Sequence, residues 1–221
     1  MDDGLGEIQR SATLAEQVYD RLRRGLLRGQ YKPGEKITAR RLARTLGVSP
    51  TPAREALTRL ASEGAIEISE TRSFLVPRLT RQRYLEISEI RKLLEPHAAL
   101  LAAPKGGAVF AARLDKLNER MKAGNLSEDF DAALELDSEF HLMFYARAAS
   151  PVLTRMIDVL WLQVGPMRTL LPHVFRKSLT GYRNHLAVIE AVRARDPQGA
   201  SNAIQKDLSD GIEGLLAALD P

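Results

Sequence analysis

The sequence predicts a mainly α-helical protein: a winged helix-turn-helix, made of three helices plus a β-hairpin, followed by an all-α helical bundle. Three observations support this class. Two short helical patterns meet at a tight break between residues 38 and 64, and an alternating apolar–polar stretch follows over residues 65–76. From residue 80 onward, every apolar stripe has helical spacing. We therefore expect a flexible tail over residues 1–11, one domain over 12–77 and a second over 78–221.

The first predicted helix covers residues 12–28. Its apolar side chains recur at i,i+4, at Leu14, Val18, Leu22 and Leu26. Pro33 and Gly34 then predict a turn over residues 30–36.

The next two helices are predicted over residues 39–46 and 52–63. Gly47 suits the end of the first, because glycine readily adopts the left-handed conformation found there. Pro50 and Pro52 suit the first turn of the second, where a missing N–H costs nothing, and Thr51 is the expected N-cap. A short helix, a turn and a second helix with basic residues near its start are typical of a helix-turn-helix with its recognition helix.

A β-hairpin is predicted directly after the recognition helix. Ile66 and Ile68 alternate with polar residues, Phe74 and Val76 do so on the return, and the turn falls at residues 70–72. A hairpin in this position is a wing.

Basic residues are concentrated in the same region. Residues 21–59 contain eleven Lys and Arg against two acids, a local charge of +9 within a chain of net charge +4. Such a block is the electrostatic signature of phosphate binding, although a solvated surface would also tolerate it. Its coincidence with the helix-turn-helix favours DNA.

The motifs PGE, LA-x-x-LGVS, TP-x-REAL and RL-x-x-EG occur in order within residues 33–64. In this arrangement the chain resembles the winged-helix domain of the GntR family of bacterial transcription regulators. The resemblance implies that Arg54 reads bases in the major groove and that Arg40 is a second DNA contact. Residue chemistry adds Ser49, Thr51 and Arg44 as phosphate contacts, and Arg72 at the wing tip as a contact to the minor groove or to the DNA backbone.

The second domain reads as helices throughout. The predicted ranges are 81–102, 108–123, 128–148 (with Ser127 as N-cap), 151–170, 178–194 and 198–219.

Four polar residues interrupt the apolar stripes of these helices. Asp137 and His141 are four residues apart, so their side chains share one helix face, and His185 and Asp207 lie on later helices. A buried carboxylate costs several kcal/mol unless it is paired or bound to a metal. Buried His–Asp pairs without metal remain an open alternative.

The order Asp-x-x-x-His, then His, then a further ligand 22 residues on, resembles the FCD effector domain of the FadR subfamily of GntR regulators, as does the stretch Leu93-Leu94-Glu95-Pro96. Metal-binding members use one aspartate and three histidines. The resemblance thus implies a divalent transition-metal site at Asp137, His141 and His185, with Asp207 in the fourth position. Imidazole and carboxylate together suit Zn²⁺, Ni²⁺, Mn²⁺ or Fe²⁺.

Arg91 and Arg168 are the candidate effector-binding residues, because each could pair with a small carboxylate; both could instead be surface arginines. The chain has no cysteine, no apolar run of membrane-spanning length and no signal-peptide pattern, which predicts a cytoplasmic protein. No nucleophile or phosphate-loop motif accompanies the metal residues, so we expect a regulator and not a metal-dependent enzyme. The full prediction is a homodimeric repressor that binds a palindromic double-stranded operator and responds to a carboxylate effector.

Overall fold

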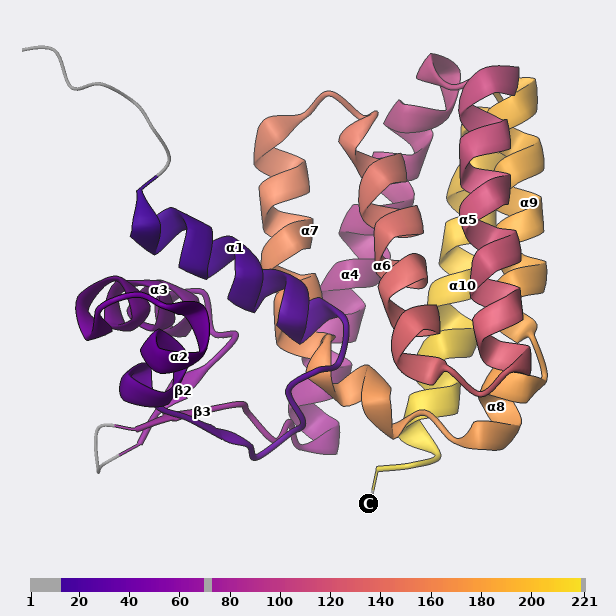
Figure 1. Ribbon diagram of the computed structural model, residues 1–221. Coiled ribbons are helices and arrows are strands. Elements are labelled where there is room, and N and C mark those ends of the chain that lie inside the picture. The colour runs from indigo at the N-terminus through magenta and orange to yellow at the C-terminus, as the bar shows by residue number, and fades with distance from the viewer. Residues whose placement is uncertain (1–12, 70–72, 220–221) are drawn as a thin grey trace, which may run out of the picture.

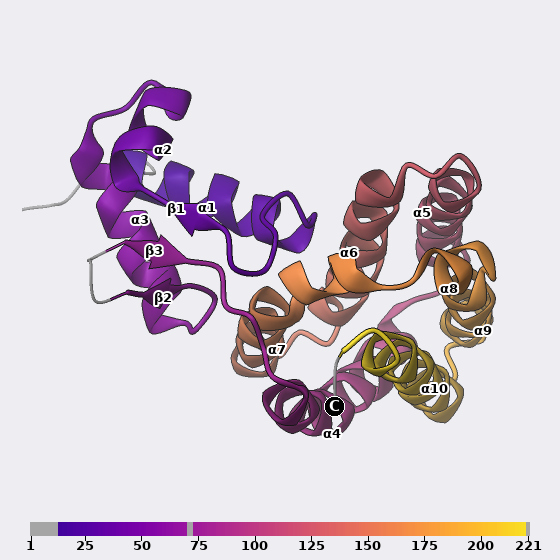
Figure 2. The ribbon, with the colours of Figure 1, turned by 90° about the horizontal axis from the view of Figure 1, so that it is seen from below.

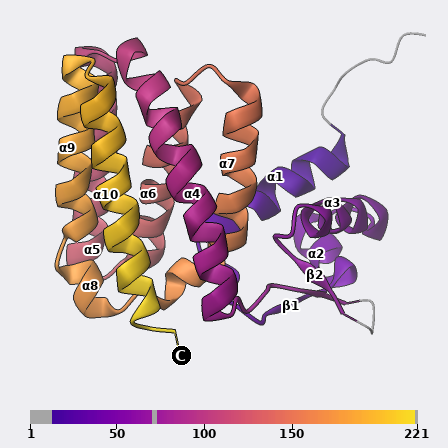
Figure 3. The same cartoon turned by 180° about the vertical axis from the view of Figure 1, so that it is seen from behind.

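The computed structural model describes residues 13–69 and 73–219 (Figure 1). Helices α1 to α3 and a small sheet form one body at the N-terminal side. Helices α4 to α10 form a bundle, whose long members run side by side in Figures 1 and 3. The mainly α architecture predicted from the sequence is confirmed.

The N-terminal body begins with α1 (Leu14–Leu27), which starts at a capping box between Thr13 and Glu16. Its side chains Leu22 and Leu26 are buried against α3.

The helix-turn-helix consists of α2 (Ala39–Leu46) and α3 (Pro50–Ser62). Gly47 ends α2 in the left-handed conformation at φ 67°, as predicted. The prediction that Thr51 caps α3 is wrong, because Ser49 is the N-cap and Pro50 already occupies the first helical position. The fixed φ of proline suits that position, so the helix starts two residues earlier than expected.

The predicted hairpin pairs β2 (Glu67–Ile68) with β3 (Phe74–Leu75), and its turn at 70–72 lies outside the described residues. The structure adds a strand that the sequence did not predict: β1 (Lys36–Ile37) pairs with β3, giving the order β1-β3-β2. Lys36 was assigned to a turn because two residues are too few to show an alternating pattern.

The bundle opens with α4 (Arg81–Ala102), whose bounds match the prediction, and a short 3₁₀ turn, η1 (Ala103–Lys105). The elements after it are α5 (Ala108–Leu126), α6 (Phe130–Ala146), α7 (Pro151–Val164), the 3₁₀ helix η2 (Pro166–Leu170), α8 (His173–Lys177), α9 (Thr180–Ala194) and α10 (Pro197–Leu216). In the described part of the chain, no helix combines the length and apolar character that crossing a membrane requires.

Two predictions in the bundle are wrong. Ser127 does not cap α6; it ends α5, and Asp129 caps α6 by accepting the backbone N–H of Ala132. The helix predicted over 151–170 ends at Val164, because Pro166 cannot supply the N–H that the next helical turn needs.

The two bodies meet where the C-terminal end of α1 points at α6 and α7 (Figure 2). Ion pairs cross this boundary from Arg23 to Asp158 at 3.0 Å, from Arg28 to Glu135, and from Lys32 to Asp131 at 3.6 Å. The first helix of the N-terminal body is therefore also a contact surface for the bundle.

Candidate nucleic-acid interface and metal centre

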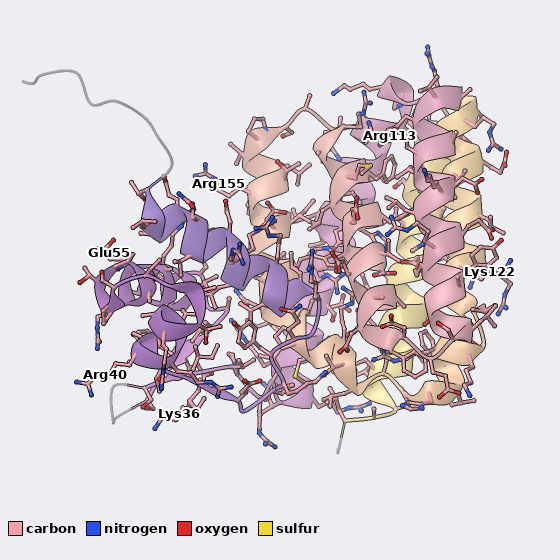
Figure 4. The ribbon with its side chains drawn as sticks, viewed as in Figure 1. Lys36, Arg40, Glu55, Arg113, Lys122 and Arg155 are labelled. Carbon is pink, nitrogen blue, oxygen red and sulfur yellow. The ribbon has the colours of Figure 1, made fainter. Side chains whose placement is uncertain are left out.

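The predicted DNA-contacting residues lie on the outside of α2 and α3. The side chains of Arg40, Arg44, Ser49, Thr51 and Arg54 are all exposed. Figure 4 shows Lys36 and Arg40 pointing away from the protein at the same corner. Arg72 lies outside the described residues, so its predicted contact stays a prediction.

The basic block divides into two sets of arginines. Within the described ranges, no carboxylate lies within ion-pair distance of Arg40, Arg44 or Arg54. Arg23 and Arg28, in contrast, pair with acids of the bundle, and Arg59 pairs with Glu63 at 3.4 Å while stacking on the ring of Tyr19. The local charge of +9 therefore overstates what can meet phosphates, and Arg40, Arg44 and Arg54 on the helix-turn-helix are among the arginines without an ion pair in the described part of the chain.

The four predicted metal residues converge inside the bundle from α6, α9 and α10. The Nε2 atoms of His141 and His185 are 3.1 Å apart. Asp207 lies 3.2 Å from the Nε2 of His141, and Asp137 lies 3.5 Å from the Nε2 of His185. One ligand atom from each of Asp137, His141 and His185 lies within 4.8 Å of the others.

The tautomer of His185 follows from its partner on α5. Its Nδ1 is 3.1 Å from the side-chain oxygen of Asn118, whose amide group donates to the carbonyl of Tyr182. The Asn118 oxygen can only accept, so the Nδ1 of His185 carries the hydrogen. In the neutral ring, Nε2 then presents a lone pair to the centre of the cluster.

His141 is oriented in the same way by a chain of hydrogen bonds. Its Nδ1 is 3.1 Å from the hydroxyl of Tyr145, and that hydroxyl donates to Glu95 at 2.8 Å. The Tyr145 oxygen therefore accepts from His141, and the Nε2 of a neutral His141 also presents a lone pair. Supporting groups of this kind are the usual means of orienting metal-ligating histidines.

Two nitrogen lone pairs and two carboxylates thus face one another, and among the described residues only Asp137 already has a cationic partner, the guanidinium of Arg168, so the set offers donors to a further cation. Two nitrogens about 2.1 Å from one ion, at angles of about 90–110°, lie roughly 3.0–3.4 Å apart. The observed separation of 3.1 Å falls in this range. The residues fit a divalent transition metal, and a proton on His141 is the competing cation.

The electrostatics favour protonation of His141 over protonation of His185. Burial opposes the charging of His141, but its hydrogen bond to Asp207 and the charges of Asp137 and Asp207 outweigh burial and raise its pKa. Burial lowers the pKa of His185 to about 4. The pKa of Asp207 is lowered, because the hydrogen bond to His141 and the two rings more than offset its own burial.

Both predicted effector arginines border a cavity of about 100 Å³ next to this cluster. Arg168 binds Asp137 through Nη2 and donates to the hydroxyl of Ser138 at 2.8 Å. Arg91 donates to Glu95 at 2.7 Å. Both guanidinium groups contact the ring of Trp161, at 4.8 and 4.9 Å from its centroid. The reading of these arginines as surface residues is therefore wrong, since Arg91 is buried and the side chain of Arg168 is largely so.

The comparisons with known proteins identify both domains. The model of the bacterial regulatory proteins of the gntR family matches residues 14–76, and the FCD domain model matches residues 86–210. The chain belongs to the GntR family and carries an FCD domain.

Relatives that match nearly the whole length of this GntR protein are transcription regulators. It is 30% identical to the HTH-type transcriptional regulator McbR of Escherichia coli K12, over 95% of both chains. It is 25% identical to the HTH-type transcriptional repressor RspR of the same organism, over 90% of this chain and 88% of RspR. The family and these relatives are regulators and not enzymes, as the sequence predicted.

Solved structures show the same fold. The structure of E. coli McbR/YncC superposes with a TM-score of 0.85 at 29% identity, covering 93% of this chain and 98% of the other. A GntR transcriptional regulator from Rhodococcus sp. RHA1 superposes with a TM-score of 0.74 at 18% identity, covering 93% and 99%. The second likeness concerns the fold alone.

Sequence reasoning missed the residues that orient the site. Glu95 and Tyr145 were assigned from the sequence to neither the metal site nor the effector site. Glu95 nevertheless lies four residues after Arg91, and Tyr145 lies four residues after His141. That spacing on a helix was the available signal. Asn118 gave no such signal, because it reaches His185 from another helix.

Proposed function

We propose that this GntR-family protein is a homodimeric repressor whose binding to an operator is controlled by a small carboxylate effector, with a divalent metal in the FCD domain. Residues 12–77 bind DNA, and residues 78–221 bind the effector and hold the dimer together. The observation that carries the proposal is the pair of inward-facing Nε2 atoms at 3.1 Å, flanked by two aspartates and a cavity. As a regulator of bacterial genes, the protein would act in the cytoplasm.

The metal would be held by Asp137, His141 and His185, with Asp207 as the fourth ligand. Zn²⁺, Ni²⁺, Mn²⁺ and Fe²⁺ all suit this mixture of nitrogen and oxygen donors. A bound ion would supply an open coordination position for an effector carboxylate. The chain itself supplies the orientation of both rings through Asn118 and Tyr145.

The effector would enter the cavity beside Arg91, Arg168 and Trp161. The indole Nε1 of Trp161 is a buried donor for which the described residues provide no acceptor. An anionic ligand with several oxygens would satisfy this N–H and share the guanidinium of Arg168 with Asp137.

A metal-free sensor of the same fold is the second candidate. The raised pKa of His141 favours it, because a protonated His141 could donate to Asp207 and satisfy the cluster without an ion. Arg91 and Arg168 would then recognise the effector without a metal.

The dimer would form through α4 and α7, which are neighbours in the bundle. Both helices leave large apolar side chains exposed, namely Ile90 and Leu93 on α4 and Val152 and Met156 on α7. A two-fold dimer would place two recognition helices on a palindromic operator. The relative RspR is a transcriptional repressor, which favours repression here.

Elemental analysis of tag-free protein purified without chelator tests the metal. We expect about one transition-metal ion per chain in the wild type and in Glu139→Ala, and loss of the ion in Asp137→Ala. Glu139 is the matched control, since it is an exposed acid on the same helix. Wild-type protein that stays metal-free after incubation with each of the four ions would replace this proposal with the metal-free sensor.

A further inference from the structure

One short segment contacts both the effector cavity and the DNA-binding domain. It runs from residue 161 in the last turn of α7 to residue 169 in η2, and we name it the coupling segment. The inference drawn from it rests on the proposed function, because it concerns how the occupancy of the cavity reaches DNA.

On its inner side, the coupling segment borders the cavity through Trp161 and Arg168. Arg168 is tied to the predicted metal ligand Asp137 and contacts the Trp161 ring. The main chain is anchored there as well, since Arg176 donates to the carbonyls of Arg168 at 2.8 Å and Leu171 at 3.0 Å. Any ligand that draws Arg168 away from Asp137 would pull on this segment.

On its outer side, the coupling segment contacts the end of the recognition helix. The side-chain amide of Gln163 donates to the carbonyl of Glu63 at 3.0 Å, and Glu63 is the C-cap of α3. Carbonyl groups at a helix end have no partner within the helix. Gln163 therefore supplies from the bundle a hydrogen bond that α3 cannot make for itself.

The coupling segment also packs closely on the C-terminal end of α1. A Cβ placed on Gly165 would lie 3.0 Å from the carbonyl oxygen of Leu26 and 3.4 Å from the Cα of Leu27. A Cβ on Gly29, which has φ 71°, would clash with the methyl group of Thr169. Glycine at position 165 lets the main chain of the coupling segment meet that of α1, and glycine at position 29 leaves room for the side chain of Thr169.

The hydroxyl of Ser138 links the coupling segment, α6 and the C-terminal end of α1. Its oxygen accepts from Arg168 at 2.8 Å. Its single hydrogen has two acceptors, the carbonyl of Leu134 within α6 at 2.8 Å and the carbonyl of Leu27 at the end of α1 at 3.3 Å. Since one hydrogen cannot serve both acceptors fully, a shift of Arg168 would change which carbonyl is served.

We propose that residues 161–169 transmit a change at Arg168 in the effector cavity to α1 and to the C-terminal end of the recognition helix. Packed interiors respond to a small shift by moving whole elements, because they have no free space to absorb it. The contacts of Gln163, Gly165 and Thr169 direct that movement toward the DNA-binding domain.

A double-mutant cycle tests the proposal. Arg168→Gln changes the cavity side and Gln163→Ala removes the contact with α3. The readout is the affinity for an operator selected by the wild-type protein from random double-stranded DNA. Although Arg168 belongs to the FCD domain, we expect its substitution to change affinity for DNA, and we expect the two effects to depart from additivity by at least about fivefold.

Asp158→Asn is the matched control. Asp158 lies on α7 and joins the DNA-binding domain through Arg23, but it lies outside the coupling segment. Its effect should combine with that of Arg168→Gln to within about twofold, as independent sites do. Additivity to within about twofold in the Gln163 cycle as well would overturn the proposal.

Amide hydrogen exchange gives a readout that needs no DNA. Arg168→Gln should change the exchange of residues 25–30 and 59–65 in the wild-type background, and should change residues 59–65 less when Gln163→Ala is present. Equal exchange in these residues with and without Arg168→Gln would refute the coupling. If Arg168→Gln does not fold, Trp161→Phe provides the cavity-side change.

The two readouts separate the two proposals. A wild-type protein that selects no DNA would refute the proposed function. The hydrogen-exchange data would still decide whether the coupling segment connects the FCD domain to the DNA-binding domain. If the protein selects an operator but the effects of Arg168→Gln and Gln163→Ala are additive, the coupling proposal is refuted and the proposed function is retained.

Discussion

The two domains of this GntR protein place their charged side chains in opposite ways. In the described part of the DNA-binding domain, the arginines of α2 and α3 lie outside a core whose buried side chains, such as Leu22, Leu57 and Leu60, are apolar. In the FCD domain, Arg91, Glu95 and His185 are buried and joined into hydrogen-bonded chains.

This difference separates two kinds of binding. Exposed, unpaired cations are available to a polyanion at little cost to folding, because water solvates them in the free protein. A buried polar network must be satisfied by its own members or by a ligand, since each group has lost its water. Substitutions of exposed arginines in the DNA-binding domain should therefore change DNA affinity, and substitutions in the buried network of the FCD domain should change the free energy of unfolding.

The largest effect is expected for Glu95→Ala. It removes both the partner of buried Arg91 and the acceptor of Tyr145, and should lower the free energy of unfolding by about 3–5 kcal/mol. Glu86→Ala, which breaks an exposed pair with Arg83 at the same 2.7 Å on the same helix, should cost about 0.5 kcal/mol or less. Urea unfolding measures both, and equal losses would erase the contrast between buried and exposed charges.

The next effect is a pH dependence that belongs to the FCD domain. The pKa of His185 falls from 6.5 to about 4 on folding, so the unfolded chain takes up a proton that the folded protein excludes. Stability should fall as pH drops from 6.5 toward 4, by about 2–3 kcal/mol between pH 7 and 4.5 from this group. His141 acts in the opposite direction, because its raised pKa contributes stability below pH 6.5 that is lost as pH rises through the folded pKa.

Urea unfolding in the presence of chelator isolates the His185 contribution. His185→Gln should show a smaller loss between pH 7 and 4.5 than the wild type, while His97→Gln, which alters an exposed histidine on α4, should match the wild type. Identical pH profiles for all three proteins would show that His185 titrates normally.

A smaller effect, confined to DNA binding, is expected for Arg54→Ala. It should reduce the preference for operator over random DNA by roughly 5- to 150-fold, which corresponds to the contribution of about 1–3 kcal/mol from a bidentate contact to guanine. The free energy of unfolding should stay within about 0.5 kcal/mol of the wild type, because the side chain is exposed and unpaired among the described residues.

The matched control is Arg113→Ala, an exposed arginine that Figure 4 shows at the far end of the FCD domain. It should leave both quantities unchanged. Undiminished discrimination in Arg54→Ala would remove this residue from base reading.

The smallest effect concerns salt. If Arg44 neutralises one phosphate, Arg44→Ala should reduce the slope of log affinity against log salt by about one, and weaken operator and random DNA alike. Arg28→Ala, whose guanidinium pairs with Glu135, should leave the slope unchanged. Similar slopes for the two variants would mean that paired and unpaired arginines contribute equally to the neutralisation of DNA phosphates.

The sequence predicted the parts of the fold that depend on local signals. The bounds of α2 and α4 agree with their apolar spacing and with end signals such as Gly47. β1 and α8 were missed, because elements of two and five residues are too short for a periodic pattern and owe their form to packing.

The cluster of Asp137, His141, His185 and Asp207 was predictable as a set of residue types and not as a network, and its role as a metal site stays a prediction. Helical spacing placed Asp137 and His141 on one face, and the structure brings His185 and Asp207 to them. The pairing of Arg168 with Asp137 joins η2 to α6, and no spacing within one helix could indicate it. Partners across helices depend on the packing of the bundle, which a single sequence does not display.

Trp161 makes the protein its own optical probe. It is the only tryptophan in the chain, so all indole emission originates from the wall of the cavity beside the His–Asp cluster. Its ring is contacted by two guanidinium groups, and any ligand that moves one of them alters the local field at the fluorophore. Unlabelled protein can therefore be screened against metal ions and small acids by fluorescence alone, and the rate of the response can be followed after rapid mixing.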